Sequence, residues 1–518
     1  MLIFCFPKFN LHPLVWVATS PLLAALASRP RLARAFGLGY LSGAIFLGGS
    51  CYWFFGVMVR YGNLHPILAL GVLALFALLF AVFFGAFGIA VGWVARSSAG
   101  VALAASPFLW VAAELARTYL FTGVPWNLLG YAVQATGVRQ VASVTGVYGL
   151  SFLAVASSAL LAWVFAARAR KPAMIAAVSW IVLLIIAHYA LRPQGPLPGS
   201  QRAFLLQPNV PLEESSLAAW EPWRDAAPLQ RLVDKSLAAA LEGRQGALPS
   251  RYDEKGGEIL AGGPPLIIWA ENPAPFFFTR DAVFRAAVET MAQKAGAYVV
   301  VNTVNFVGPS AEKATNSAVI LDPNGRVLMT YDKIHLVPFG EYVPDWAFPG
   351  KIGKITSEVG SYVPGSSYSV AKTPQGTIGV FICYESIFPQ LVRRLALAGA
   401  EVLVNISNDA WYGDSAAAAQ HLEMARLRAI ENRRYLLRAT NDGITAVIDP
   451  YGRVFASLPR HRLMVLTGWF SYLGTRTFYT AHGDVFAWLC VAVAMLIGVW
   501  CITVRRRQGA SGDGKDRL

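Results

Sequence analysis

Long, charge-poor apolar runs constrain the fold of this 518-residue chain more than any other feature. A helix of roughly 20 residues crosses the hydrocarbon core of a bilayer, and the runs reach or approach that length. Hydrophobic residues make up 55% of the chain, which is too high for an ordinary soluble protein. Seven membrane-spanning helices are expected, near Pro13–Ala27, Leu38–Val59, Pro66–Ala95, Val101–Leu120, Ala142–Ala167, Ala173–Leu191 and Asp484–Val504.

Basic residues follow the first, third, fifth and last of these runs, so they fall on one side of the expected membrane. Positively charged loops stay cytoplasmic, which places the long segment before the last span outside the membrane. The net charge of +14 suits an anionic membrane surface. No basic array interleaved with aromatic residues predicts nucleic-acid binding. The basic loop residues are Arg29, Arg31, Arg34, Arg96, Arg168, Arg170, Lys171, Arg505, Arg506 and Arg507.

The chain therefore divides into a membrane bundle, a soluble domain and a closing span. We expect the bundle over residues 1–193, a linker rich in proline and glycine over 194–200, and the soluble domain over 201–475. The last span covers 484–504, and residues 505–518 form a basic cytoplasmic tail.

The soluble domain alternates short β-rich runs with helical patterns, which predicts an α/β class with helices covering sheet faces. Asp-Pro-x-Gly turns at Asp322 and Asp449 follow β-rich runs and predict two hairpins. Expected strands are Tyr298–Val304, Ser317–Leu321, Thr377–Ile382 and Val402–Ile406, and expected helices are Asp281–Ala295 and Pro389–Ala398.

Three chemically capable side chains stand at the edges of β-rich runs, in the order Glu271, Lys333 and Cys383. Such edges are where α/β proteins assemble active sites. Of the five cysteines, only Cys383 lies outside apolar, membrane-like sequence, so it has no disulfide partner within the domain. An unpaired thiol in an oxidising compartment is a candidate reactive group.

These segments resemble the Glu-Lys-Cys set of the nitrilase (carbon–nitrogen hydrolase) superfamily, over roughly Arg202 to Trp469. The order of bundle, nitrilase-like domain and closing span further resembles the apolipoprotein N-acyltransferase family. The resemblance implies a four-layer α-β-β-α sandwich. The stretches that match the family are Val337–Pro344, Ile406–Gly413, Gln420–Ala429, Arg438–Thr445, Glu114–Arg117 and Gly123–Trp126.

The resemblance also implies a role for each polar residue. Cys383 is the nucleophile that attacks an ester carbonyl, and Glu271 takes and returns the thiol proton. Lys333 stabilises the tetrahedral oxyanion. Glu341 is expected to hold Lys333 in place, and Glu385 to orient the incoming amine.

The implied reaction is a ping-pong acyl transfer between membrane-tethered substrates. The donor is a phospholipid, typically phosphatidylethanolamine, and the acceptor is the α-amine of an S-diacylglyceryl cysteine at a lipoprotein's N-terminus. We expect a monomer. No metal and no nucleotide or other cofactor are expected, because the corresponding motifs are absent from the sequence. Residues expected to line the lipid site are Trp220, Trp223, Tyr384, Asn408, Trp411 and Trp126.

Three alternatives stay open at this point. A membrane-anchored amidase would pass its acyl group to water, and a catalytically dead scaffold would only bind lipoproteins. A Cys-His mechanism would pair Cys383 with His335 or His421, as in cysteine proteases.

The segment Pro344–Ser367 is long and rich in glycine and proline, and it carries Trp346, Phe348 and Tyr362. Loops of this length are usually functional or disordered. We expect an arm that dips to the bilayer and gates lipid entry, with a surface insertion packed on the domain as the alternative.

The N-terminus departs from the family pattern of eight spans with both ends cytoplasmic. Met1–Pro7 resembles the end of the family's first span, and Phe9–Ala27 resembles its second. Either most of one helix is lost or the true start lies upstream of Met1. With seven spans, Met1 is expected outside and Leu518 inside.

Overall fold

The computed structural model forms two compact units. The membrane unit comprises Met1–Phe55, His65–Gln194 and Ala481–Leu518, and the sandwich unit comprises Gly56–Leu64 and Gly195–Thr480. The structure describes residues 1–166, 170–195, 197, 199–211, 226–245, 251–252, 258–259, 263–271, 277–307, 313–342 and 362–512.

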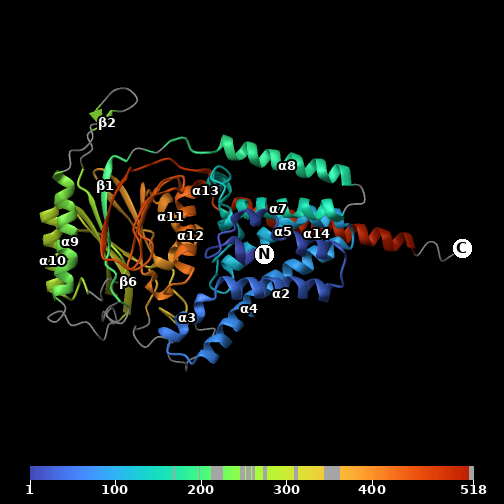
Figure 1. The fold of residues 1–518 in the computed structure, drawn as a ribbon, viewed down its shortest axis with the longest axis horizontal. Coiled ribbons are helices and arrows are strands. Elements are labelled where there is room, and N and C mark those ends of the chain that lie inside the picture. The colour runs from blue at the N-terminus through green and yellow to red at the C-terminus, as the bar shows by residue number, and fades with distance from the viewer. Residues whose placement is uncertain are drawn as a thin grey trace. The chain divides into compact units, whose positions relative to one another are not determined.

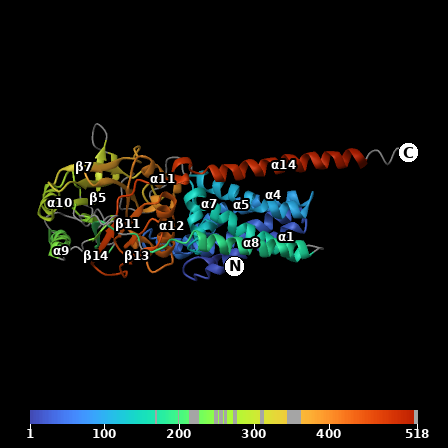
Figure 2. The same cartoon turned by 90° about the horizontal axis from the view of Figure 1, so that it is seen from above.

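Six helices of the described membrane unit are long and apolar enough to cross a bilayer, and they run side by side in both views (Figures 1 and 2). Small residues let α2 and α4 approach closely, as is typical of helices packed in membranes. A Cβ atom at Gly39 would collide with the carbonyl oxygen of Phe84, and one at Gly88 with that of Ala35. The six helices are α2 (Leu32–Ser50), α4 (Pro66–Ala95), α5 (Ala99–Tyr119), α7 (Val147–Ala166), α8 (Arg170–Ala190) and α14 (Val485–Gly512).

The expectation of seven uninterrupted spans is wrong in three places. The first run folds as a short 3-10 turn, η2 (His12–Trp16), and a short helix, α1 (Ser20–Ala27). Each has a proline in its first positions, where the missing N–H favours a helix start rather than a continuing helix.

The second run breaks after α2, where the weak helix formers Gly48, Gly49 and Ser50 occur together, and resumes as α3 (Trp53–Arg60). In the fifth run, Gly146 adopts a φ of 64° between α6 (Ala142–Thr145) and α7. This is a left-handed conformation that interrupts the helix. Hydropathy detects the apolar composition of these runs but not the breaks.

Two six-stranded sheets make up the middle of the sandwich unit. Sheet 1 has the strand order β14-β1-β4-β5-β6-β7, and sheet 2 has the order β13-β12-β11-β10-β9-β8. In each sheet three neighbouring strands are parallel, β1, β4 and β5 in sheet 1 and β9, β10 and β11 in sheet 2. The strands are β1 (Gln201–Gln207), β4 (Leu266–Trp269), β5 (Tyr298–Val307), β6 (Lys313–Leu321), β7 (Val327–Asp332), β8 (Val370–Thr373), β9 (Gly376–Ile382), β10 (Val402–Ser407), β11 (Tyr435–Thr440), β12 (Ala446–Ile448), β13 (Val454–Ser457) and β14 (Met464–Phe470).

The four-layer expectation is confirmed. Strands β1 and β4 pack against β11, and β6 packs against β9, so the sheets face each other. Helices α9 (Ala226–Gln245) and α10 (Ala282–Ala295) cover sheet 1, and α11 (Pro389–Leu397) and α12 (Ala417–Asn432) cover sheet 2 (Figure 1). A continuous apolar core joins α9 and α10 to sheet 1.

Both predicted hairpins are confirmed, β6–β7 and β12–β13. The Asp322 carboxylate accepts hydrogen bonds from the backbone N–H groups of Asn324 and Arg326, and Asp449 does the same for Tyr451 and Arg453. This is the Asx-turn chemistry that the Asp-Pro-x-Gly pattern predicts.

Several short elements complete the described chain. They are η1 (Leu2–Cys5), η3 (Leu129–Ala132), η4 (Val138–Val141), β2 (Arg251–Tyr252), β3 (Glu258–Ile259), η5 (Cys383–Ile387), η6 (Asp409–Tyr412) and α13 (Phe478–His482).

Most of the expected lipid-gating arm, including Trp346 and Phe348, lies outside the described residues. Tyr362 is described, and it packs in a small apolar cluster with Val304 and Leu336. Its backbone N–H donates to the carbonyl of Glu341 at 3.1 Å.

Candidate active site

The ends of three strands place Glu271, Lys333 and Cys383 in one region of the sandwich unit. Glu271 lies just beyond β4, Lys333 directly follows β7, and Cys383 directly follows β9. All three are buried, with exposed fractions of 4%, 1% and 6%. Lys333 Nζ lies 3.2 Å from Glu271 Oε1, so two of the three predicted residues are in direct contact.

Lys333 is shared between two carboxylates. Besides Glu271, its Nζ atom donates to Glu341 Oε1 at 2.8 Å, and Glu341 Oε2 accepts from the backbone N–H of Val337 at 2.7 Å. Burial alone would lower the pKa of Lys333, but Glu271 and Glu341 outweigh it and hold that pKa well above its ordinary value. The side chain is therefore a fixed ammonium cation.

Cys383 is the first residue of η5, at the sharp turn that follows β9, and has a φ of 49°. This is a left-handed conformation that residues other than glycine seldom adopt. Burial, and after it the negative charge of Glu271, raise the pKa of the Cys383 thiol, which Lys333 and a hydrogen bond with Ser407 only partly offset. The resting group is a neutral thiol, so nucleophilic attack requires a base.

Asn316, on β6, joins the two carboxylates and was missed from the sequence. Its Nδ2 atom donates to Glu271 Oε1 and to Glu341 Oε1, both at 2.9 Å. The Nδ2 atom of Asn302 donates to Asn316 Oδ1 at 2.8 Å, which fixes the orientation of the Asn316 amide. No local sequence motif identifies Asn316 as a site residue, because polar side chains are common within strands.

Glu385 ties the Cys383 turn to the loop that carries Lys333. Its Oε1 atom accepts from the backbone N–H groups of Ile334 and His335, and its Oε2 atom accepts from that of Ile382. The Tyr331 hydroxyl reaches both oxygens, at 2.9 and 3.0 Å. Burial raises the pKa of Glu385 to about 7. This carboxylate is occupied by the chain itself, which favours a fastening role over the expected contact with an incoming amine.

The residues expected to line a lipid site differ in exposure and do not form one cluster among the described residues. Tyr384 is partly exposed, and its ring lies edge-on to Phe388. Trp411 is partly exposed and packs edge-on against Tyr61, whose hydroxyl donates to the Ala410 carbonyl at 3.2 Å. Trp220 and Trp223 lie outside the described residues.

Asn408 is fully buried beside Glu271, and its backbone N–H donates to Glu271 Oε2 at 2.9 Å. Its Oδ1 atom accepts from the Ala410 N–H and from Asn441 Nδ2. Within the described part of the chain, its Nδ2 atom has no hydrogen-bond partner. A buried amide donor of this kind is available to a bound carbonyl or hydroxyl oxygen.

Trp126 belongs to the membrane unit, where it is buried against Trp53 with ring centroids 4.8 Å apart. It forms part of an aromatic core there, so its own contacts favour packing over substrate binding.

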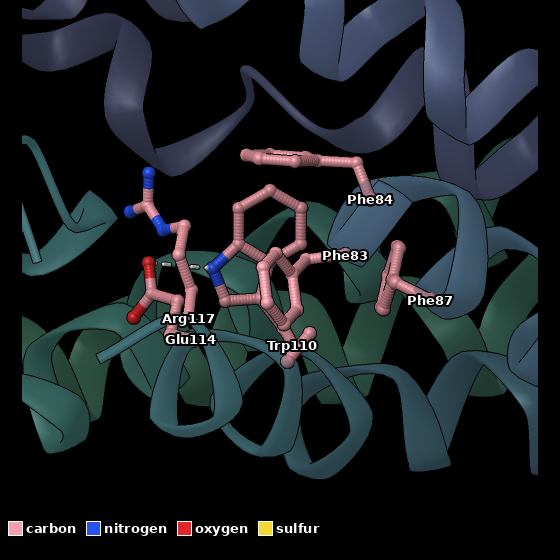
Figure 3. A pocket seen from close by; sticks show the side chains of 7 residues that line it. Phe83, Phe84, Phe87, Trp110, Glu114 and Arg117 are labelled. Carbon is pink, nitrogen blue, oxygen red and sulfur yellow. Dashed lines mark hydrogen bonds between the residues drawn. The ribbon is translucent and has the colours of Figure 1, made fainter. Parts of the chain in front are cut away.

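The Glu114–Arg117 motif lines an aromatic pocket of the membrane unit (Figure 3). Trp110 Nε1 donates to Glu114 Oε1 at 3.0 Å, and the Leu129 N–H donates to the same oxygen at 2.7 Å. The Arg117 guanidinium lies 5.8 Å from the ring centroid of Phe84.

The two histidines of the Cys-His alternative have other contacts. The ring of His335 packs against that of Phe388, with centroids 3.6 Å apart and the planes tilted by 34°. The Nε2 atom of His421 lies 3.1 Å from the carbonyl oxygen of Cys383 and 2.5 Å from Ser386 Oγ. The His421 ring thus meets the main chain of the nucleophile turn, which argues against the alternative. Among the described residues, no group of three or more His, Cys, Asp or Glu side chains is arranged to hold a metal ion.

Known proteins match both units of the chain. The family model for the carbon-nitrogen hydrolase domain matches residues 219–470, and the model for the apolipoprotein N-acyltransferase N-terminal domain matches residues 1–160. Apolipoprotein N-acyltransferase of Geobacter metallireducens is 35% identical over 96% of this chain and 92% of its own length. That of Methylococcus capsulatus is 33% identical over 98% and 96%.

Solved structures are more distantly similar to this chain. The nitrilase-superfamily member Nit3 of Saccharomyces cerevisiae is 19% identical over 52% of this chain and 90% of its own, with a TM-score of 0.37. A Nesterenkonia amidase is 19% identical over 55% and 96%, also with a TM-score of 0.37. The assignment rests instead on the near full-length sequence matches, which extend over both units. The chain therefore belongs to the apolipoprotein N-acyltransferase family.

Proposed function

We propose that the protein moves an acyl chain from a phospholipid to the N-terminal α-amine of a diacylglyceryl lipoprotein, through a thioester on Cys383. The observation that carries this proposal is the buried Glu271–Lys333–Glu341 cluster beside Cys383, within a chain whose membrane and sandwich parts both match the acyltransferase family. Phosphatidylethanolamine is the proposed donor, and we expect the monomer to be sufficient.

The first half-reaction begins with the neutral thiol. Glu271 takes the proton of Cys383 as its sulfur attacks the ester carbonyl carbon, and a C–S bond forms. The negative charge on the former carbonyl oxygen is stabilised by the Lys333 ammonium, which is positioned before substrate arrives. The C–O bond then breaks, and Glu271 returns the proton to the departing lysophospholipid alcohol.

The second half-reaction repeats these steps with an amine. The lipoprotein α-amine attacks the thioester carbon, Glu271 accepts a proton from the nitrogen, and Lys333 again stabilises the oxyanion. The C–S bond breaks, and the sulfur regains a proton. An amide and a free thiol result, so the enzyme is unchanged over the cycle.

Supporting residues keep this arrangement rigid. We propose that Glu341 and Asn316 hold Lys333 and Glu271 at a fixed separation, and that Glu385 fastens the Cys383 turn to the Lys333 loop. Tyr384, Asn408 and Trp411 are the described residues proposed to meet substrate.

The proposed reaction also implies a side of the membrane for the catalytic domain. We propose that residues 201–475 form the catalytic domain on the outer side of the bacterial inner membrane. The six apolar helices anchor it where both lipid substrates reside. The arginines after the first, third and last expected spans support this orientation.

Transfer to an amine rather than to water is the decisive test. The purified protein in phosphatidylethanolamine nanodiscs is mixed with an S-diacylglyceryl-cysteine peptide, and products are followed by mass spectrometry. We expect one N-acyl peptide per lysophospholipid released, and no product from Cys383→Ala. Cys490→Ala, in α14, is the matched cysteine control and should keep full activity. Free fatty acid in place of N-acyl peptide would show the amidase alternative instead.

A further inference from the structure

The nucleophile turn has a second support that the acyl-transfer steps do not use. Cys383 holds a φ of 49°, and such conformations persist only where surrounding groups over-determine them. Glu385 secures the residue before Cys383 through the Ile382 N–H. The carbonyl of Cys383 itself is met by His421 from α12, with the Nε2 atom at 3.1 Å.

The contact with the Cys383 carbonyl favours one protonation pattern of the His421 ring. A carbonyl oxygen only accepts hydrogen bonds, so Nε2 must be the protonated nitrogen if it bonds to Cys383. Ser386 Oγ lies 2.5 Å from the same Nε2 atom, and a hydroxyl group can accept from a protonated Nε2 or donate to a bare one, so this contact is compatible with either tautomer. His421, Ser386 and Asp409 are all fully buried, so water does not compete for these bonds.

Arg438 and Asp409 set the other side of the ring. Arg438 Nη2 lies 2.7 Å from Asp409 Oδ2 and 3.0 Å from His421 Nδ1, so its two hydrogens serve one acceptor each. Asp409 Oδ1 also lies 3.0 Å from Nδ1 and accepts from Ser407 Oγ at 2.8 Å. A carboxylate oxygen can accept twice, so this contact alone permits a proton on Nδ1, whereas the Arg438 N–H group, which can only donate, requires a bare Nδ1. Burial, and after it the charge of Arg438, lower the pKa of His421, which keeps the ring neutral. Nδ1 is then an acceptor, and Nε2 is the donor.

We propose that His421 is a positioning residue for the acyl-transfer reaction. As the neutral Nε2–H tautomer, set by Arg438, it donates to the Cys383 carbonyl and holds the turn that aims the thiol. The role is exerted through the main chain, so His421 takes no proton from the substrate or from sulfur. This inference rests on the proposed thioester chemistry, whereas its first test below does not.

The first test reads the tautomer in the unmodified protein. Nitrogen-15 NMR of histidine-labelled protein separates a protonated ring nitrogen from a bare one, and the His421→Gln spectrum assigns the signal among the seven histidines. We expect a protonated Nε2 and a bare Nδ1 at neutral pH. A protonated Nδ1 with a bare Nε2 would overturn the proposal, because Nε2 would then have no hydrogen to donate.

The second test uses a matched pair of variants in single-turnover acylation by phosphatidylethanolamine. His421→Leu fills a similar volume without a donor, and His421→Gln places an amide N–H near the Nε2 position. We expect His421→Leu to slow thioester formation about 10²-fold, the typical effect of misplacing a reacting group, at an unchanged half-saturating lipid concentration. His421→Gln should recover most of that loss.

Glu423→Gln, elsewhere on α12, is the control and should acylate at the wild-type rate. Equal rates for His421→Leu and His421→Gln would reduce His421 to a packing residue. A wild-type rate in His421→Leu would contradict the proposal outright. Loss of thioester formation in the wild type as well would count against the proposed function, while the NMR result would still stand.

Discussion

Two ionic clusters lie on either side of Cys383, and they differ in the balance of negative and positive charge. The sheet 1 cluster contains two carboxylates, Glu271 and Glu341, for the single ammonium of Lys333. The sheet 2 cluster consists of the Asp409–Arg438 ion pair and the neutral imidazole of His421. One carboxylate is therefore in excess in the first cluster and is available for a proton, whereas the second is balanced.

This difference in charge balance predicts different roles for the two clusters in the reaction. The sheet 1 cluster is expected to change its protonation in every half-reaction, and the sheet 2 cluster to keep its protonation throughout. Buried charge pairs are expensive unless their hydrogen bonds are complete, so each cluster is sensitive to the loss of one partner. The substitutions below separate the two roles, beginning with the largest expected effect.

Removing the excess carboxylate should have the largest effect. Glu271→Gln keeps the size of the side chain but cannot accept the thiol proton, so thioester formation should fall about 10²–10⁴-fold, the range of a lost general base. Stopped-flow quenching with mass detection of the acyl-enzyme measures this rate. A wild-type rate in Glu271→Gln would remove Glu271 from the proposed chemistry.

The same substitution should make the thiol more acidic while making the enzyme slower. The Glu271 carboxylate disfavours a neighbouring thiolate, so its loss lowers the pKa of Cys383. Lys333→Met should act in the opposite direction, because it removes the cation that favours the thiolate. Rates of Cys383 alkylation by iodoacetamide against pH report both shifts. Shifts of the same sign in the two variants would contradict the assigned electrostatics.

Loss of the oxyanion partner should come next in size. Lys333→Met should slow acylation about 10²–10³-fold, as removal of an oxyanion donor typically does. The substitution also leaves Glu271 and Glu341 facing each other without a cation, so Lys333→Arg, which restores the charge, is the companion variant. If charge alone were sufficient, Lys333→Arg would recover the full rate. We expect only partial recovery, because the guanidinium is larger.

Asn316→Leu should have an intermediate effect. It removes the amide that bonds both carboxylates, each at 2.9 Å, while the volume is kept. Hydrogen bonds to charged groups contribute about 1.5–3 kcal/mol, so acylation should slow roughly 10- to 100-fold. Single-turnover acylation measures the effect, and an unchanged rate would show that Glu341 alone keeps Lys333 in place.

Tyr331→Phe should have the smallest effect on rate. The hydroxyl bonds Glu385, which fastens two loops but does not exchange protons with substrate in the proposed cycle. Its loss leaves a fully buried carboxyl group with one fewer donor, so we expect thermal unfolding at lower temperature with acylation nearly unchanged. A large loss of rate without loss of stability would place Tyr331 in the chemistry instead.

The sequence identifies residues that follow apolar runs more readily than residues inside them. The sequence could identify Glu271, Lys333 and Cys383 because each follows a β-rich run. It could identify Glu341 because that residue lies in a distinctive family motif. Asn316 sits within β6, where only the tertiary pairing with Asn302 and the two carboxylates shows its importance. The contact of His421 with Cys383 joins different elements of the fold, α12 and η5, and no local pattern predicts it.

The membrane part shows the same limit in another form. Composition predicted the apolar helices, and the structure confirms α4, α5 and α8 close to their expected bounds. Helix α14 begins where expected but continues to Gly512, through Arg505–Arg507, so the expected break at Val504 is wrong. The interruptions at Ser50–Trp53 and Gly146 depend on local backbone preferences that a window average conceals. Hydropathy therefore gives the number of apolar runs more reliably than the number of continuous helices.

The thioester on Cys383 is tested most directly by the mass of the enzyme after exposure to phospholipid without an acceptor. The protein in phosphatidylethanolamine nanodiscs is quenched in acid, digested and searched for an acylated Cys383 peptide. We expect one acyl chain on Cys383, sensitive to neutral hydroxylamine, with an equal amount of lysophospholipid released. Lysophospholipid release with Cys383 unmodified, or acylation that persists in Cys383→Ala, would contradict this expectation.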